Sequence, residues 1–344
     1  MAYTTVPKST DYFNTKLYTG TGSSNAITGV GFQPDFVWQK SRSAAEYHGL
    51  FDAVRGVTKR LRSAATAAES TQAGSLTAFG SDGFTVGGSP NNDAANGNGQ
   101  TFVSWNWKAN GQGSSNTDGS INTTYTSAST TSGFSICQYT GTGANATIGH
   151  GLGVAPKMII VKQTNTTRDW AVYQKFSNTD GTGAQYYLHL NNTDARTSSS
   201  GFWNNTDPTS SVFSVGSNSN TNQSGGTFIA YCFADIQGYS KFGSYIGNGN
   251  NDGAFVYTGF KPAWIMFKRT TGAEGWIMAD NKRDPYNSVT KYLEANTNVA
   301  EGTGVDYDFL SNGFKFRTTS QNESGQTYIY MAFAEEPLVS TNGN

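Results

Sequence analysis

The sequence predicts an all-β protein built from three tandem antiparallel β-sandwich repeats. Three observations lead to this prediction: landmarks that recur three times along the 344 residues, apolar side chains that alternate with a period of two, and Gly/Asn turns between short apolar runs. A period of two is typical of strands with one buried face. Many short strands with such turns between them are typical of sandwiches.

Each repeat begins with the pattern Tyr-x-Gly-x-Gly, and a proline follows 16 or 17 residues later. The glycines allow the backbone to turn sharply, because glycine tolerates positive φ. An apolar run follows the proline and ends in a lysine six residues beyond it. The tyrosines are Tyr18, Tyr139 and Tyr245, and the lysines are Lys40, Lys162 and Lys268.

The recurrence divides the chain into units of roughly 100 residues, which is the size of a domain. Only four residues separate the second repeat from the third, so we expect these two to pack side by side. The predicted segments are an N-terminal arm (1–13), repeats at 14–110, 133–236 and 241–340, and a Gly/Ser/Thr/Asn-rich linker (111–132).

The apolar pattern identifies the strands that form the core of each repeat. The last strand of each repeat carries large apolar side chains on one face, and these include Trp107, Phe233 and Phe333. The runs 158–161 and 264–267 are apolar on both faces, which predicts central strands covered on both sides. The stretch 57–68 is either a short helix or a strand with a loop.

Composition excludes several classes of protein. The 23 Lys and Arg and the 24 Asp and Glu give a net charge of −1, which argues against a nucleic-acid partner. The longest apolar run, 228–234, is far shorter than the roughly 20 residues of a membrane-spanning helix, so we expect no membrane insertion. The start carries no apolar signal segment, which predicts folding in a cytoplasm, with Cys137 and Cys232 reduced and buried.

Candidate chemistry is sparse, and we expect neither an enzyme nor a bound metal or cofactor. His48 stands where the other repeats have Trp170 and Trp276, which favours a packing position over a catalytic base. Asp52 and Asp280 each precede an arginine by three residues, which predicts a structural salt bridge that fixes a turn. The second repeat has Gln174 and Ser177 in these places, and the Asn/Asp-rich loops lack the spacing of a calcium loop.

Turn and core signatures occur in the segments 1–22, 27–38, 52–56, 81–84 and 332–340. Together these segments resemble a family of virion proteins of marine tailed phages, and the resemblance covers nearly the whole chain. It implies a structural or tail-fibre-like protein, and it assigns no catalytic or binding residues.

We therefore expect a non-enzymatic structural protein of a tailed-phage virion, assembled in the host cytoplasm. It would be a capsid decoration or a tail-appendage or fibre building block, with jelly-roll or lectin-like repeats. Its partners would be other virion proteins in a larger or homo-oligomeric assembly. The alternative is a glycan-binding lectin module for attachment to host cells. The repeats differ most in the loops 89–100, 197–210 and 280–291, where Trp203 and Tyr286 are candidates for stacking on sugar rings.

Overall fold

The computed structural model describes residues 4–88 and 93–336, and it confirms an all-β protein. Strands hold 42% of the residues and helices 5%. The described α-helices are single turns, α1 (Asp93–Asn96), α2 (Ser200–Trp203) and α3 (Ser219–Asn222). The stretch 57–68 is a strand with a loop and not a helix, because it holds only the short strand β5 (Lys59–Arg60).

Four strands are paired in the same order in three successive parts of the chain, which we call units 1, 2 and 3. In each unit the first strand pairs with the last, the last with the third, and the third with the fourth. We call this the inner sheet. Its strands are β1 (Phe13–Thr19), β9 (Thr101–Trp107), β3 (Phe36–Ser41) and β4 (Gly49–Asp52) in unit 1. They are β11 (Phe134–Thr140), β18 (Thr227–Phe233), β13 (Met158–Gln163) and β14 (Ala171–Gln174) in unit 2. They are β19 (Ser240–Ile246), β26 (Thr327–Ala334), β21 (Pro262–Arg269) and β22 (Ile277–Asp280) in unit 3.

A smaller outer sheet covers one face of each inner sheet. In unit 1 it contains β2 (Asn25–Thr28), β8 (Gly83–Val86) and β7 (Leu76–Gly80). In unit 2 it contains β12 (Ala146–Gly149) and β17 (Val212–Val215). In unit 3 it contains β20 (Phe255–Tyr257), β25 (Gly313–Phe316) and β24 (Gly302–Leu310), which continue the inner sheet through β23 (Val289–Glu294). The remaining strands are β6 (Ser70–Thr71), β15 (Tyr186–His189) and β16 (Thr197–Ser198).

The segment 111–132 is more than the connection that we predicted. Its residues Tyr125–Ser129 form β10, which pairs with β11 and extends the inner sheet of unit 2. Ile121 forms a further bridge to Ile148 of the outer sheet. The sequence hides this strand because residues 125–129 are small or hydroxylated side chains without an apolar alternation.

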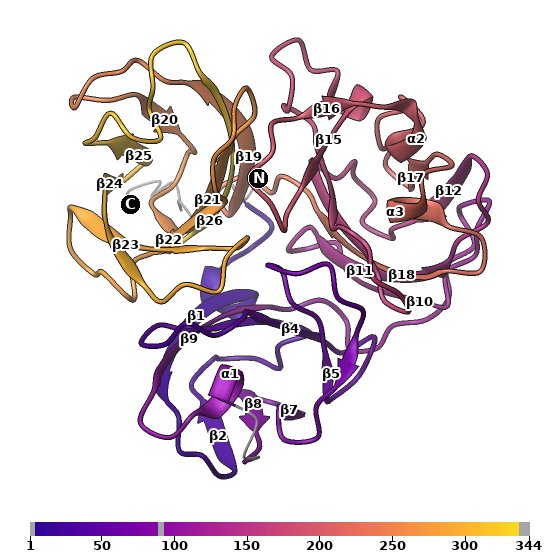
Figure 1. Cartoon of the computed structure of the whole chain (residues 1–344), viewed down its shortest axis with the longest axis horizontal. Helices are drawn as coiled ribbons and strands as arrows, with labels where there is room; N and C mark the ends of the chain where they lie inside the picture. Colours follow the sequence, from indigo (N-terminus) through magenta and orange to yellow (C-terminus); the bar gives the residue numbers. More distant parts are fainter. Residues whose placement is uncertain (1–3, 89–92, 337–344) are drawn as a thin grey trace, which may run out of the picture.

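The three inner sheets surround one shared core (Figure 1). Alternate residues of one strand point to different cores: Phe36 and Trp38 of β3 lie in the shared core, and Val37 lies inside unit 1. On β13, Met158 and Ile160 likewise face the centre. The prediction of strands covered on both sides is therefore confirmed for 158–161 and 264–267, and the second cover is the neighbouring units.

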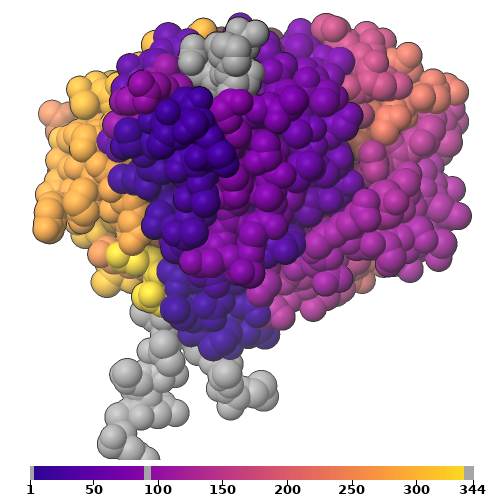
Figure 2. Space-filling model, turned by 90° about the horizontal axis from the view of Figure 1, so that it is seen from below, coloured from indigo at the N-terminus to yellow at the C-terminus, as the bar shows by residue number. Residues whose placement is uncertain are grey.

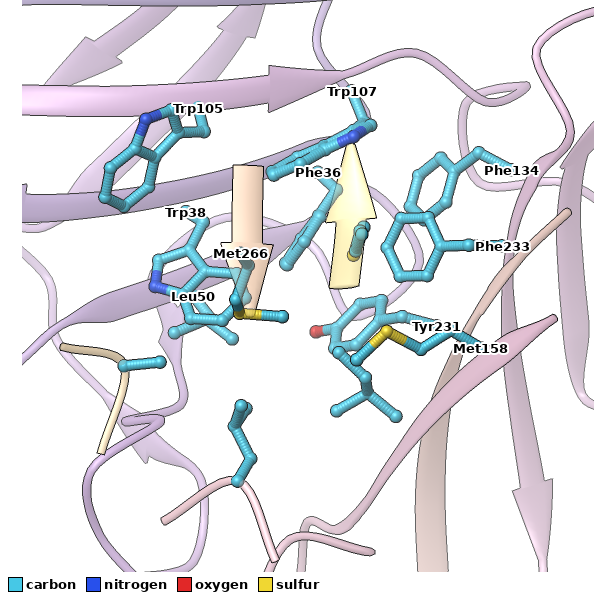
Figure 3. Close-up of a cluster of buried hydrophobic side chains, with 14 of the residues drawn as sticks. Phe36, Trp38, Leu50, Trp105, Trp107, Phe134, Met158, Tyr231, Phe233 and Met266 are labelled. Atoms are coloured by element: carbon cyan, nitrogen blue, oxygen red, sulfur yellow. The ribbon is translucent and has the colours of Figure 1, made fainter. Parts of the chain in front are cut away.

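Trp107, Phe233 and Phe333 are buried, as predicted, and they meet one another at the centre of the molecule. Their ring centroids are 6.2 Å apart for Trp107 and Phe233, 5.7 Å for Trp107 and Phe333, and 6.3 Å for Phe233 and Phe333. We call these three side chains the axial triad. Figure 3 shows Trp107 and Phe233 beside a second contact between units, in which Phe36 stacks on Tyr231 at 4.3 Å.

The N-terminal segment that the structure describes is held by its own chain. Val6 is fully buried in the shared core, and Phe13 stacks on Phe333 at 4.9 Å. Thr10 and Glu335 line the same small cavity, so the two described ends of the chain lie close to each other. Figure 2 shows both ends of the colour scale at the same lower edge.

Both cysteines are buried and free, as the sequence predicted. Cys137 and Cys232 lie on the adjacent strands β11 and β18, inside unit 2. Burial raises the pKa of the Cys232 thiol well above its ordinary value. The pair therefore contributes to the core as two small apolar side chains.

Replacing Phe333 with alanine should lower the free energy of unfolding by about 3–5 kcal/mol, since it removes a buried aromatic side chain from the axial triad. The change is measured by urea unfolding followed by tryptophan fluorescence. Tyr286→Ala is the control, because this side chain is 82% exposed and should leave the midpoint unchanged. An unchanged midpoint for Phe333→Ala would contradict the role assigned to the triad.

Candidate functional site

One backbone hydrogen bond recurs at each of the three interfaces between units. Glu69 N donates to Thr164 O at 2.8 Å, and Arg196 N donates to Thr270 O at 2.9 Å. Glu301 N donates to Arg42 O at 2.8 Å, which joins unit 3 back to unit 1. The three units therefore form a closed ring in which every interface uses the same backbone positions.

The position shared by His48, Trp170 and Trp276 also serves the interfaces. Trp170 Nε1 donates to Arg62 O at 2.9 Å, and Trp276 Nε1 donates to His189 O at 2.8 Å. His48 Nε2 lies 2.9 Å from Glu294 O, while its Nδ1 accepts from the indole of Trp38 at 2.9 Å, so Nε2 carries the proton. Each side chain thus binds a carbonyl of the adjacent unit.

His48 is fully buried, which fits the packing position that its place in the repeat favoured. Burial lowers the pKa of its imidazole well below the ordinary value, and the nearby Lys40 lowers it further. The ring therefore remains neutral at physiological pH, with both nitrogens engaged. A general base needs a nitrogen within reach of a substrate proton, which this placement does not offer.

The lysine six residues after each proline is buried at the end of its strand. Lys162 Nζ donates to Thr66 O of unit 1 at 3.1 Å and to Gln163 O at 2.8 Å. Lys268 Nζ donates to Thr193 O of unit 2 at 3.0 Å and to Arg269 O at 2.9 Å. Lys40 makes its two bonds within unit 1. Burial lowers the pKa of each lysine to about 8.

The Asp/Arg pairs are structural, as predicted, and they also connect units. Asp52 Oδ2 accepts from Arg55 Nε at 2.6 Å and from the hydroxyl of Tyr231 in unit 2 at 2.8 Å. Asp280 Oδ2 accepts from Arg283 Nε at 2.6 Å and from the indole of Trp105 in unit 1 at 3.1 Å. Each carboxylate therefore accepts a hydrogen bond from the last strand of a neighbouring unit, which we call the closing strand (β9, β18 and β26 in units 1, 2 and 3).

Unit 2 has no Asp/Arg pair at the equivalent position, and this difference has a physical reason. The residue of unit 3 that corresponds to Trp105 and Tyr231 is Met331, whose thioether donates no hydrogen bond. Unit 2 has Gln174 opposite it, and this neutral side chain donates to Gly243 O of unit 3 at 3.2 Å. An aspartate at position 174 would be a buried charge with no tyrosine or tryptophan opposite it to donate a hydrogen bond, and burying such a charge is costly.

A polar groove of about 580 Å³ lies between units 1 and 2. Arg55 and Glu69 lie in it, joined at 3.1 Å, and the ring of Tyr125 lines it. Between units 3 and 1, the side chain of Arg42 occupies the equivalent place and binds Glu301 at 2.9 Å. Unit 2 has the smaller Thr164 at the position of Arg42. The other lining residues are Val54, Lys59, Thr71, Gln112, Gln138, Thr164, Asn165 and Thr227. Amides, hydroxyls and one aromatic ring are suited to a small hydroxylated ligand.

The two candidate stacking residues have different surroundings. Trp203 is 1% exposed and packs against Tyr173 at 5.9 Å, so this candidate is corrected: it is a core residue of unit 2 and has no free face for a sugar. The short helix α2 turns its ring inward, which the loop composition did not reveal. Tyr286 is 82% exposed beside a pocket of about 160 Å³ and remains a candidate. The loop 89–100 lies partly outside the described residues.

Among residues 4–88 and 93–336, no group of three or more His, Cys, Asp or Glu side chains is placed to hold a metal ion. Asp252, in one of the Asn/Asp-rich loops, instead binds Lys315 at 2.6 Å and Arg317 at 3.2 Å. Across the same described ranges, no helix is long and apolar enough to span a membrane.

Residues 8–337 match the family described as Domain of unknown function (DUF7483). The chain belongs to this family. The match spans the inner and outer sheets of all three units, so the DUF7483 domain corresponds to the closed ring and not to one unit. No curated protein and no solved structure matches the chain.

Two exposed aromatic residues were not predicted from the sequence: Phe255 and Tyr257, which are 46% and 60% exposed on β20. Period-two alternation around Val256 would have found them, since it places both side chains on the outward face. A comparison of the equivalent strands in the other repeats would have shown small residues in their place.

Stability should rise between pH 8 and 10 through the buried lysines. Their pKa is about 8 in the folded protein and near 10.4 in unfolded chains, so the unfolded state binds more protons in this range and the free energy of unfolding increases with pH. Urea unfolding at pH 7 and pH 9.5 measures this. The difference between the wild type and a Lys162→Met/Lys268→Met variant isolates the lysines, and parallel pH profiles would refute the assignment.

Asp280→Asn should reduce the free energy of unfolding by about 3 kcal/mol, because it leaves the fully buried Arg283 with a weaker counter-charge. Asp252→Asn is the matched control: its carboxylate also pairs with an arginine but is exposed, and the midpoint should not move measurably. Urea unfolding of both variants gives the comparison. Equal effects of the two substitutions would contradict the interface role of Asp280.

Proposed function

We propose that the protein is a non-enzymatic structural component of a tailed-phage virion, exposed on the particle as a capsid decoration or as a building block of a tail appendage or fibre. The resemblance of its turn and core motifs to virion proteins of marine tailed phages supports this assignment. We also propose that the units are diverged copies of one sandwich of the jelly-roll or lectin-like kind. Their shared strand order supports common descent.

The observation that carries the proposal is the location of the repeated polar side chains. The lysines, the His/Trp position and the Asp/Arg pairs are buried, and their hydrogen bonds hold strand ends and neighbouring units together. What the three copies have kept in common is therefore the construction of a rigid ring. A repeated active site would instead leave a common set of polar groups open to a substrate.

Two of the three histidines, His48 and His150, are placed in a way that supports a function without turnover. The third, His189, contacts Asn192 through Nδ1, and within the described part of the chain its buried Nε2 makes no hydrogen bond. Both ring nitrogens of His48 are hydrogen bonded, as are those of His150, which contacts Thr209 O and Leu152 N at 3.2 Å each. Burial lowers the pKa of both imidazoles. Neither is arranged as a base beside a nucleophile.

Particles that lack the protein provide the test. Purified protein should bind to such virions to a fixed copy number per particle, measured by quantitative mass spectrometry after the particles are re-isolated. A heat-unfolded sample is the control for adhesion. Failure to bind these particles, or degradation of host surface polysaccharide by the purified protein, would overturn the proposal.

A further inference from the structure

Unit 3 carries two exposed aromatic side chains on the edge strand of its outer sheet. Within residues 4–88 and 93–336, strand β20 pairs only with β25, so it forms the edge of the eight-stranded sheet. Val256 points inward and is 5% exposed, whereas Phe255 and Tyr257 point outward and are 46% and 60% exposed. Because Phe255 and Tyr257 are two positions apart on the same face of one strand, about 6.6 Å separates their Cα atoms.

The equivalent strands of the other two units carry small residues in place of these rings. Val256 pairs with Phe314, just as Ile27 pairs with Phe84 and Ile148 with Phe213. This register places Phe255 and Tyr257 at the positions of Ala26 and Thr28 in unit 1, and of Thr147 and Gly149 in unit 2. In unit 1 the same strand forms with small exposed residues, whereas in unit 2 the segment 116–121 covers this face and Gly149 is buried. Unit 1 therefore shows that the strand does not need an aromatic pair.

The neighbouring strand lets the Phe255 ring lie over the sheet. Gly313 of β25 has no Cβ, and the place that a Cβ would occupy overlaps the backbone oxygen of Val256 and is 2.9 Å and 3.0 Å from two ring atoms of Phe255. Strand pairing therefore already requires a glycine here, as it does at Gly83 of unit 1, and the ring of Phe255 lies over the space that this glycine leaves. Gly313 is also the cross-strand partner of Tyr257, so no side chain stands opposite the second ring.

Charged side chains border the two rings on the same face. Lys315 is the cross-strand partner of Phe255, and Asp308 is the partner of Lys315. Arg317 binds Asp308 at 2.6 Å and the exposed Asp252 at 3.2 Å. The border therefore offers carboxylate acceptors and cationic donors beside each other.

This combination favours a sugar over a protein partner. The C–H faces of pyranose rings pack on aromatic rings, and their hydroxyl groups both donate and accept hydrogen bonds. A protein partner of ordinary stability covers about 800 Å² with an apolar centre, and two rings enclosed by charges do not supply that. The outward position on an edge strand leaves an extended ligand room to continue past the sheet.

We propose that Phe255 and Tyr257 form a stacking platform for successive pyranose rings of a surface polysaccharide, with Asp252, Lys315 and Arg317 contacting the sugar hydroxyls. The platform belongs to unit 3 alone. It does not depend on the protein being part of a virion.

The test uses the full chain with the substitutions Phe255→Ala and Tyr257→Thr, which introduce the residues that unit 1 has at these positions. Folding should be retained, and an unchanged urea midpoint checks this. The probes are a printed array of neutral and acidic microbial polysaccharides, followed by calorimetric titration of the best-bound one. We expect the double variant to bind at least tenfold more weakly, and Tyr47→Ala, an aromatic exposed on unit 1, to bind within twofold of the wild type.

The outcomes separate this platform from the structural role. Loss of polysaccharide binding with normal binding to bare virions supports the platform. Equal binding by the wild type and a folded double variant would overturn it, as would wild-type protein that is retained by no polysaccharide on the array. Failure to bind virions would count against the structural role and leave the platform standing.

Discussion

The axial triad is the contact on which the rest of the structure depends. Trp107, Phe233 and Phe333 come from the closing strands of three units and touch one another at the centre. An inner sheet buries one face in its own unit and the other against its neighbours, so each unit taken alone would expose the apolar residues of its central face. The units are consequently parts of one folded body.

Polar groups determine how the units fit around that core. A buried side chain with hydrogen-bonding capacity is costly unless it is satisfied, and at these interfaces the partner comes from the next unit. Gln174 stands opposite Met331, whereas Asp52 and Asp280 stand opposite the donors Tyr231 and Trp105, so the two sides of each interface match in hydrogen-bonding capacity. Such matched pairs fit each side of a unit to one particular neighbour within the closed ring.

The sequence predicted the features that depend on local pattern. Alternation located the closing strands, because burial of one strand face leaves a period of two, and continuous apolar runs located the doubly buried strands. The ring was not predicted, because the second face of an inner sheet has the same composition whether an outer sheet or another unit covers it. Trp203 was misplaced since a one-turn helix leaves no periodic signal, and β10 was missed for lack of apolar residues.

One shared core should make the three units fold and unfold as a single body. Native-state hydrogen exchange across a series of denaturant concentrations tests it most directly, because exchange resolves parts of a protein that open separately. We expect the slowest amides of β9, β18 and β26 to exchange with the same free energy and the same denaturant dependence. Separate opening reactions for the three closing strands, one for each unit, would contradict it.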